Sequence, residues 1–260
     1  MSFETIKLEV KDSIAYLTID QPKSLNALSS QVLKELSEAA TEIAESEDAK
    51  IVIITGAGEK SFVAGANIKE MKELNAIEGR DFSDLGNSTF EKIANLPQPT
   101  IAAVNGYALG GGCELAISCD IRLASENAVF GQPEVGLGIT PGFGGTQRLP
   151  RLIPTGIAKE LIYTARNIKA QEALEIGLVN HVYTQDELLG EAEKLAGKIL
   201  GNGQLAVQKS KKAIDIGLDS SLQRGLDMER EVFGALFATE DQKEGMSAFI
   251  EKRQAEFKNK

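Results

Sequence analysis

The chain has 260 residues, of which 42% are hydrophobic and 25% charged, a composition typical of a globular protein with one or two domains. Its formal net charge of -10 at pH 7 disfavours nucleic acids and anionic membranes as partners, because their phosphates would be repelled. No apolar run approaches the length of a membrane span, and the N-terminus lacks the pattern of a signal peptide, so we expect a cytoplasmic protein.

The first fifty residues predict a β-hairpin followed by a helix. Residues 5–10 and 14–19 alternate apolar and polar side chains around a short turn, which is the pattern of two half-buried antiparallel strands. An amphipathic helix then runs to about Glu45. Asn26 and Ser29 precede it, where turn and N-cap chemistry accounts for them without a functional role.

The next segment predicts a strand, a loop and a polar helical region. Residues 51–55 are all apolar except the last, as in a strand buried on both faces. The loop at 56–61 superficially resembles a phosphate-binding turn, but it lacks the full P-loop spacing, which makes a nucleotide-dependent enzyme the weakest candidate. The small residues at 62–69 let a backbone lie against a ligand. We expect the polar region 70–96 to be a mobile insertion that covers a cleft.

The stretch 101–134 carries the strongest functional signal. An apolar run ends at Asn105-Gly106, and the glycines at 110–112 lead into a helix. Glycines at such a junction permit positive φ and let a ligand approach the backbone closely. The first amides of a helix have no partner within it and lie at its partially positive end. This junction therefore predicts a place that holds developing negative charge.

Two acidic residues flank this junction. Glu114 lies in the first turn of the predicted helix, and Glu134 follows Gly-Gln-Pro. A strand at 121–124 and a turn near Glu126 would bring the chain back, although the spacing alone also allows a capping Glu114 and a solvated Glu134. Two carboxylates in one apolar cleft do not both ionise cheaply, so one holds its proton near neutral pH. Such a pair can act as general acid and general base.

The rest of the chain is mainly helical. The predicted elements are a glycine-dense loop at 135–146, helices at 146–152, 155–164 and 170–176, a last strand at 178–182, and helix from about 187 to the end. The recurring strand, strand, helix order predicts stacked ββα units in residues 1–195 and a helical region in residues 196–260. We expect apolar faces in that region to associate with another copy of the chain, although they could also pack back on the chain's own core; they comprise Leu222, Leu226, Phe233, Leu236 and Phe237.

Cysteine and histidine usage gives no sign of a metal site. Cys113 and Cys119 lie in one apolar segment without CxxC spacing, so we expect two buried core thiols. The single histidine, His181, leaves little room for a Ser-His-Asp triad or a histidine-based metal centre. We therefore expect a structural histidine and no metal.

Five segments resemble the crotonase (enoyl-CoA hydratase/isomerase) superfamily, in the family's order along the chain. They are KSLNAL at 23–28, SFVAGANIKEM at 61–71, AVNGYALGGGCE at 103–114, FGQPE at 130–134 and PGFGGTQRL at 141–149. The resemblance covers essentially the whole chain and is strongest to bacterial short-chain enoyl-CoA hydratases, the 3-hydroxybutyryl-CoA dehydratases.

The resemblance implies an α/β fold, a crotonase-like spiral of ββα units with a C-terminal helical trimerisation region, assembled as a trimer or a dimer of trimers. It implies a hydro-lyase that adds water across the 2,3 double bond of a 2-enoyl-CoA. Glu114 would activate the water that adds at Cβ, and Glu134 would exchange the proton at Cα. The backbone N–H groups of Ala66 and Gly111 would form the oxyanion hole.

The resemblance also implies which residues bind the substrate. The acyl-CoA site would comprise Lys23, Leu25, Ala64, Ala66, Asn67, Ile68, Lys69 and Gly111. No cofactor is implied, because coenzyme A is part of the substrate. Asn67 stands where the family usually has aspartate; since the proposed donor is the Ala66 backbone, we expect activity to survive the loss of the aspartate's salt link.

Two rivals remain within the superfamily. Related isomerases often place a carboxylate at the position of Gly142, so two glutamates together with a neutral residue there favour a hydratase. A non-catalytic RNA-binding or scaffold member is disfavoured by the acidic composition and by the intact glutamate pair.

Overall fold

The structure is a computed structural model that describes residues 3–260. It divides into two compact units, one formed by the chain up to Leu96 together with 100–193, and the other by 97–99 together with 194–260. The first unit holds both β-sheets and all the predicted site residues. The second is helical.

Two sheets organise the first unit. The larger has the strand order β1-β2-β3-β5-β7-β10, and the smaller has the order β4-β6-β8-β9. The strands are β1 (Ile6–Lys11), β2 (Ile14–Ile19), β3 (Ile51–Gly56), β4 (Ser61–Val63), β5 (Thr100–Val104), β6 (Tyr107–Leu109), β7 (Ile121–Ser125), β8 (Val129–Gly131), β9 (Asn167–Lys169) and β10 (His181–Tyr183).

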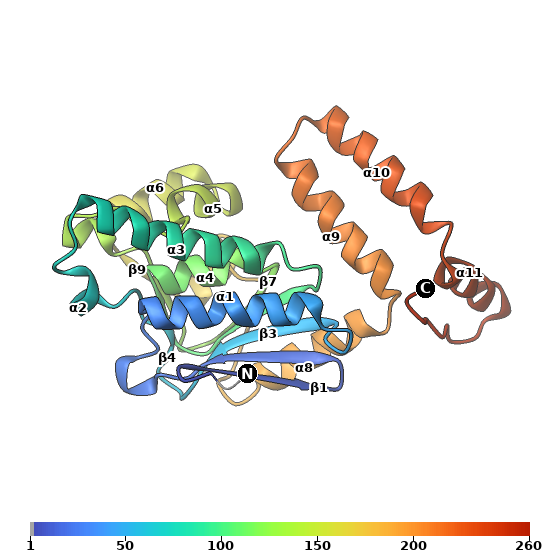
Figure 1. Ribbon diagram of the computed structural model, residues 1–260, viewed down its shortest axis with the longest axis horizontal. Helices are drawn as coiled ribbons and strands as arrows, with labels where there is room; N and C mark the ends of the chain where they lie inside the picture. Colours follow the sequence, from blue (N-terminus) through green and yellow to red (C-terminus); the bar gives the residue numbers. More distant parts are fainter. Residues whose placement is uncertain (1–2) are drawn as a thin grey trace. The chain divides into compact units, whose positions relative to one another are not determined.

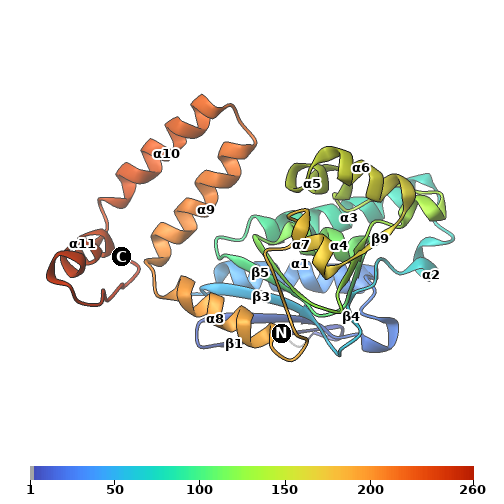
Figure 2. The ribbon, with the colours of Figure 1, turned by 180° about the vertical axis from the view of Figure 1, so that it is seen from behind.

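Helices surround these sheets (Figures 1 and 2). They are the short turns η1 (Pro22–Ser24) and η2 (Glu134–Leu137), and the helices α1 (Ser30–Glu45), α2 (Ile68–Met71), α3 (Ala76–Ala94), α4 (Gly111–Ser118), α5 (Gly145–Leu152), α6 (Thr155–Thr164) and α7 (Ala170–Glu175). Helix α8 (Leu188–Leu200) begins in the first unit and continues into the second.

The expected repetition of ββα units is confirmed. The successive pairs β3–β4, β5–β6 and β7–β8 each give their first strand to the larger sheet and their second to the smaller one, and each pair is followed by a helix. Because the second strand always turns into the other sheet, the chain advances as a spiral. The fold is therefore the crotonase-like α/β architecture that the sequence predicts.

The N-terminal hairpin is also as predicted. β1 and β2 pair antiparallel from Ile6 opposite Ile19 to Lys11 opposite Ile14. The turn residues Asp12 and Ser13 both have positive φ, at 49° and 63°, which is the backbone of the two-residue turn that matches the twist of a hairpin. The remaining strands of this sheet pair in parallel.

The expectation of a mobile insertion at 70–96 is wrong for most of that segment. Helix α3 packs beside α1 (Figure 1) and buries Phe82, Phe90 and Ile93 in the core. Asn75 and Glu78 close a capping box at its first turn, which fixes where it begins. The apolar residues of α3 recur at helical spacing, and polar residues between them hide this pattern in the composition.

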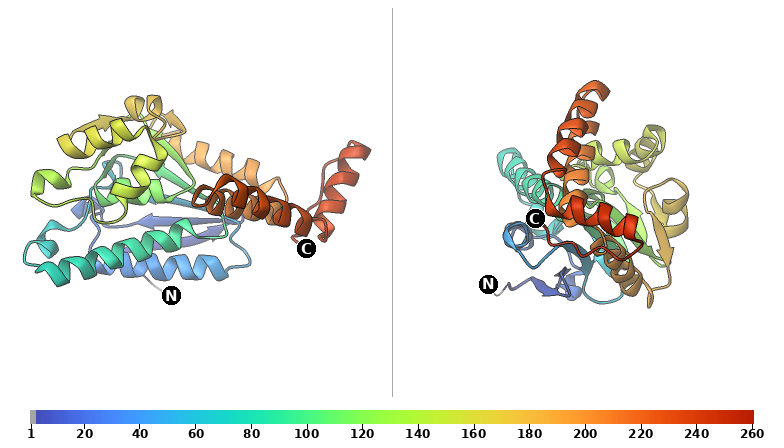
Figure 3. Two further views of the ribbon diagram at one scale, coloured as in Figure 1. Left: turned by 90° about the horizontal axis from the view of Figure 1, so that it is seen from above. Right: turned by 90° about the vertical axis from the view of Figure 1, so that its right-hand side faces the viewer.

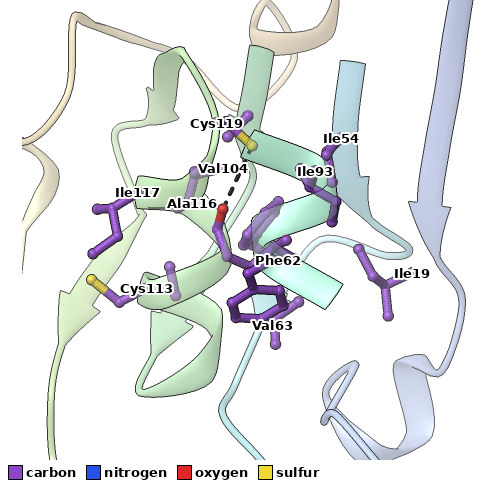
Figure 4. Packing of buried hydrophobic residues seen from close by; sticks show 14 of the residues in the cluster. Ile19, Ile54, Phe62, Val63, Ile93, Val104, Cys113, Ala116, Ile117 and Cys119 are labelled. Atoms are coloured by element: carbon purple, nitrogen blue, oxygen red, sulfur yellow. Dashed lines mark hydrogen bonds between the residues drawn. The ribbon is translucent and has the colours of Figure 1, made fainter. Parts of the chain in front are cut away.

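Both cysteines are buried, as expected, and neither forms a disulfide within residues 3–260. Figure 4 shows them among apolar side chains, with the Cys119 N–H donating to the Ala116 carbonyl at the end of α4. His181 is exposed at the start of β10. That strand covers 181–183 rather than 178–182, because the Leu178 and Val179 N–H groups donate to the Ala173 carbonyl in α7 rather than to a neighbouring strand.

The second unit contains the helices α9 (Gln204–Leu218), α10 (Leu222–Leu236) and α11 (Glu240–Glu251). α9 and α10 pack side by side (Figure 3), and Gly217 lies against Gly225 where they approach. The expectation of helix to the end of the chain is wrong for 252–260. That tail is held instead by hydrogen bonds, such as those from the Lys258 and Asn259 N–H groups to Asp241.

Within residues 3–260, no helix is both long enough and apolar enough to cross a membrane.

Candidate active site

The loop that follows β4 exposes one backbone amide. Leu28 pairs with Ala66 as a parallel bridge, in which the Leu28 N–H donates to the Gly65 carbonyl at 2.9 Å and the Leu28 carbonyl accepts from the Asn67 N–H at 2.8 Å. Successive peptides in such a ladder face opposite edges. The Ala66 N–H therefore faces away from Leu28, and it has no backbone acceptor within the described chain.

A second glycine-rich junction lies directly beside this loop. Gly110 caps α4 with a φ of 51°, and Gly111 is the first residue of the helix. A Cβ at Gly112 would overlap the Val63 carbonyl, and one at Gly110 would lie 3.9 Å from the Gly65 Cα. Only glycine permits so close an approach. The loop at Ala66 and the start of α4 therefore share one neighbourhood.

Glu114 projects from the first turn of α4 and is only 1% exposed. Its Oε1 accepts two backbone hydrogen bonds, from the Phe143 N–H at 2.8 Å and from the Gly145 N–H at 2.7 Å. The first donor lies in the glycine-dense loop before α5, and the second is the first residue of that helix. This junction therefore fixes the direction of the Glu114 carboxyl group.

Glu134 begins η2, and its carboxyl group lies against Gly110, where a Cβ would overlap Oε1. Gly110 is also the cap of the helix that carries Glu114, so the structure brings the two carboxyl groups to the same helix start. The Glu134 Oε2 is buried and has no hydrogen-bond partner within residues 3–260. A buried carboxyl oxygen without a hydrogen bond costs free energy unless another group donates to it.

Burial is the main influence on both carboxyl groups. It raises the pKa of Glu114 to about 7; the nearby charge of Glu134 adds to this rise, while the hydrogen bonds from Gly145 and Phe143 oppose it. Burial also raises the pKa of Glu134. Near neutral pH the site can therefore hold one carboxylate and one carboxylic acid, which is the arrangement needed for a base and an acid.

Apart from Gly111 at the start of α4, the residues that the resemblance assigns to acyl-CoA lie in two connected segments, the strips 23–25 and 64–69. Lys23 lies in η1, and Leu25 follows it with its carbonyl accepting from the Ala64 N–H at 3.0 Å. Asn67 caps α2, accepting from the Lys69 N–H at 3.1 Å. In this chain the amide at position 67 thus caps the helix, as the usual aspartate can. Between these two residues, Ile68 is 53% exposed.

Sequence reasoning missed three polar side chains near Glu114. Arg148 donates to the Phe143 carbonyl at 3.0 Å, and its charge lowers the pKa of Glu114. Ser83 and Asn87 on α3 both donate to the Gly142 carbonyl, at 2.5 Å and 2.7 Å. Arg148 lies inside the matched segment 141–149, so the sequence did mark that region as functional. Ser83 and Asn87 are 55 or more positions from Gly142 in sequence, and no local pattern marks them.

Within the described part of the chain, no group of three or more histidine, cysteine or acidic residues is arranged to hold a metal ion.

Comparisons with known proteins identify the family. The family model described as enoyl-CoA hydratase/isomerase matches residues 9–260. A short-chain-enoyl-CoA hydratase of Clostridium acetobutylicum is 58% identical, with all of both chains covered. A crotonyl-CoA hydratase of Syntrophomonas wolfei is 54% identical, also over both full lengths.

Solved structures extend the agreement to the backbone. The crystal structure of an enoyl-CoA hydratase from Bacillus anthracis superposes with a TM-score of 0.96 at 44% identity, covering 99% of this chain and 100% of that one. An enoyl-CoA hydratase structure from Geobacillus kaustophilus gives a TM-score of 0.97 at 37% identity, covering 100% and 98%. The chain therefore belongs to the enoyl-CoA hydratase/isomerase family.

Proposed function

We propose that this protein is a hydro-lyase that adds water reversibly across the 2,3 double bond of short-chain 2-enoyl-CoA thioesters to give 3-hydroxyacyl-CoA. The observation that carries the proposal is the meeting of Glu114 and Glu134 at the start of α4, beside the Ala66 loop. Two full-length relatives, named short-chain-enoyl-CoA hydratase and crotonyl-CoA hydratase, support the substrate class.

The backbone amides of Ala66 and Gly111 are proposed to bind the thioester oxygen. Adding water at Cβ pushes electron density through Cα onto that oxygen. Fixed N–H groups stabilise the developing charge without reorganising, and each is worth about 3 to 4 kcal/mol in a well-formed oxyanion hole. This stabilisation removes the need for a strong base, and the proposal requires no cofactor beyond the coenzyme A of the substrate.

The two glutamates are proposed to move the protons. Ionised Glu114 accepts a proton from the water whose oxygen bonds to Cβ, and protonated Glu134 delivers its proton to Cα. The double bond is consumed, one O–H bond breaks, and the glutamate pair keeps the same total number of protons. The raised pKa of each group suits it to this exchange near neutral pH.

The strips at 23–25 and 64–69 are proposed to hold the coenzyme A portion of the substrate. Lys23 and Lys69 supply positive charge for phosphate groups in a chain whose net charge is -10. The exposed backbone around Ala66 and Asn67 supplies hydrogen-bonding groups for the adenine end and the thioester end. The cytoplasmic location and the lack of a cofactor remain predictions.

An isomerase that moves a double bond is the alternative within the family. It needs a carboxylate poised over a different carbon, often at the position of Gly142. Here the nearest atom that a Cβ at Gly142 would meet is the Ser83 Oγ, at 3.8 Å, so the space is available but no acidic side chain fills it. This neutral position favours hydration.

A direct assay tests the proposal. Purified protein should hydrate crotonyl-CoA with a turnover at least about a hundredfold above its isomerisation of a 3-enoyl-CoA of the same length, a ratio that one positioned acid–base group can supply. Within a C4 to C16 enoyl-CoA series, kcat/KM should be highest at the short end. Preferential isomerisation would show that the protein is an isomerase. No turnover of either substrate would contradict the proposal that it is an enzyme.

We further propose that the chain assembles as a homotrimer or a dimer of trimers through its C-terminal helices. No residue of α10 is buried, and Leu222 and Phe233 are 79% and 64% exposed. Exposed apolar faces of this kind mark interaction sites. Light scattering at micromolar concentration should give a mass of three or six chains, with Phe233→Glu reducing it. A monomeric parent protein would contradict this proposal.

A further inference from the structure

We infer that Ser83 and Asn87 on α3 are positioning residues for Glu114, acting through the single peptide that joins Gly142 to Phe143. This inference rests on the proposed function, because it assigns Glu114 a reaction to be positioned for. It concerns two side chains that lie outside every motif matched in the sequence.

The peptide group between Gly142 and Phe143 connects α3 to Glu114. Its carbonyl oxygen accepts from the Ser83 hydroxyl at 2.5 Å and from the Asn87 amide at 2.7 Å. Its N–H donates to the Glu114 Oε1 at 2.8 Å. The bond is trans, as are all those described, so the carbonyl and the N–H point in opposite directions. Holding the carbonyl on α3 therefore aims the N–H at the carboxyl group.

The second donor to Glu114 is held in the same way, except that backbone N–H groups rather than side chains bind the carbonyl of its peptide. The Gly145 N–H belongs to the peptide whose carbonyl is that of Gly144. That carbonyl accepts from the Gln147 and Arg148 N–H groups at 2.9 Å and 2.8 Å, in the first turn of α5. Both peptides that hold Glu114 thus have two donors on their carbonyl oxygens, and only the pair on α3 is replaceable by mutation.

Without this hold, the peptide would be free to rotate. Gly142 lacks a side chain, and Gly144 has a φ of 108°, so the backbone on either side is unusually permissive. The Phe143 ring is fixed against Gly86, with Phe82 and Phe90 at ring-centre distances of 5.3 Å and 5.7 Å. Ring packing places residue 143, whereas the two hydrogen bonds set the rotation of the peptide before it.

Loss of the hold has a defined consequence for the reaction. Glu114 would lose one of its two N–H donors, which favour its charged form. Its pKa would rise further, and its carboxyl group would be free to turn away from the water. The charged groups that act on Glu114 from neighbouring elements are Glu134 on η2 and Arg148 on α5. Substitution at Ser83 or Asn87 leaves both in place.

The test compares Ser83→Ala, Asn87→Ala and the double variant with Ser88→Ala. Ser88 is exposed on the same helix, and its hydroxyl donates only to the Leu85 carbonyl, so it controls for helix propensity. The double variant should lower kcat for crotonyl-CoA hydration about 10- to 100-fold, the effect of one hydrogen bond to a charged group. Its KM should stay within about twofold, because α3 lies outside the proposed coenzyme A strips.

The pH dependence separates positioning from simple structural support. The acid limb of kcat should move to higher pH in the double variant, with each single variant in between, because the Gly142 carbonyl keeps one donor. Ser88→Ala should match the parent. A double variant that folds and keeps the parent's kcat and acid limb would overturn the inference, as would a loss of activity explained entirely by unfolding with an unchanged acid limb.

Failure of the inference is distinguishable from failure of the proposed function. If the parent hydrates crotonyl-CoA and the double variant does so equally, only the inference fails. If the parent hydrates nothing, an isotope-edited infrared titration of the Glu114 carboxyl, assigned by its loss in Glu114→Gln, decides the inference alone. A higher pKa in the double variant supports it, and an unchanged pKa overturns it.

Discussion

Two buried glutamates, Glu35 on α1 and Glu114 on α4, differ in what surrounds them. They are 4% and 1% exposed, yet the pKa of Glu35 is lowered to about 2 and that of Glu114 is raised to about 7. Glu114 lies much deeper in the protein than Glu35, so burial raises its pKa more strongly. The depth of burial and the number and placement of hydrogen-bond donors together decide the difference.

Glu35 has donors on both oxygens. Burial acts to raise its pKa, but hydrogen bonds from the Thr5 hydroxyl, the Gln31 amide and the N–H groups of Thr5 and Glu4 together lower it. Oε1 accepts from Glu4 and Gln31, and Oε2 accepts twice from Thr5. A carboxylate held in this way is stable as an anion, so Glu35 fastens the N-terminal segment to α1.

Glu114 receives both of its hydrogen bonds on Oε1. Oε2 lies outside these bonds, and the charge of Glu134 adds to the effect of burial. The carboxyl group is thus fixed in direction but is not saturated as an anion. This comparison teaches that a buried carboxyl group becomes reactive when its surroundings orient it without fully satisfying it.

Replacing each of these two glutamates by glutamine should show the difference between the two sites most clearly. Glu114→Gln should lower the hydration rate at least about a hundredfold while the fold is retained, because the base is removed. Glu35→Gln should leave kcat unchanged and lower the free energy of unfolding by about 1 to 3 kcal/mol, because a donor then faces the Thr5 N–H. Steady-state kinetics and urea unfolding measure the two effects. Equal losses of activity would show that the two sites do not differ as described.

Glu134→Gln should also lower the hydration rate at least about a hundredfold. The amide keeps the shape of the side chain beside Gly110, so circular dichroism and the unfolding midpoint should stay close to those of the parent. Near-parental turnover would defeat its assignment as the proton donor to Cα.

The rate of hydration should depend on pH as a bell. On the acid side, kcat should fall below about pH 7, because Glu114 must be ionised to accept the proton and its pKa is about 7. On the alkaline side, kcat should fall as Glu134, whose pKa is also raised, loses its proton. The two limbs belong to the pair rather than to either residue. A pH-independent kcat between pH 5 and 9 would contradict the acid–base roles.

The two glutamates should make the free energy of unfolding depend on pH in opposite ways. We expect this effect to be smaller than the effects on activity. The folded pKa of Glu35, about 2, lies below its unfolded value of roughly 4.3, so its contribution is present above that value and is lost as pH falls toward 2. The folded pKa of Glu114, about 7, lies above its unfolded value, so its ionisation lowers stability as pH rises from roughly 4.3 to 7.

Unfolding free energies of the parent and the two glutamine variants, measured between pH 3 and 8, test this difference. Relative to the parent, Glu35→Gln should lose its disadvantage at the acid end. Glu114→Gln should become relatively more stable toward neutral pH. Parallel curves for all three proteins would contradict the opposite shifts.

The sequence predicted the local elements well where short patterns decide them. The hairpin turn at Asp12 and Ser13, the N-cap at Ser29 and the glycine junction before Glu114 all depend on neighbouring residues. The recurring strand order was also legible, because each ββα unit is contiguous in the chain.

The features that the sequence did not predict depend on contacts between distant segments. The hydrogen bonds from Ser83 and Asn87 to Gly142 cross more than fifty positions. The packing of α3 into the core was hidden because its apolar residues are diluted by charged ones. The four donors to Glu35 are likewise unpredictable, since three of them come from Glu4 and Thr5, which lie before β1 and some thirty positions earlier.

A crystal structure with a bound, unreactive acyl-CoA thioester tests the central claim most directly. We predict that the thioester oxygen lies about 2.7 to 3.1 Å from the backbone nitrogens of both Ala66 and Gly111, with the Glu114 and Glu134 carboxyl groups over the adjoining Cβ and Cα. A thioester oxygen that meets neither amide, or that lies away from both glutamates, would contradict the account.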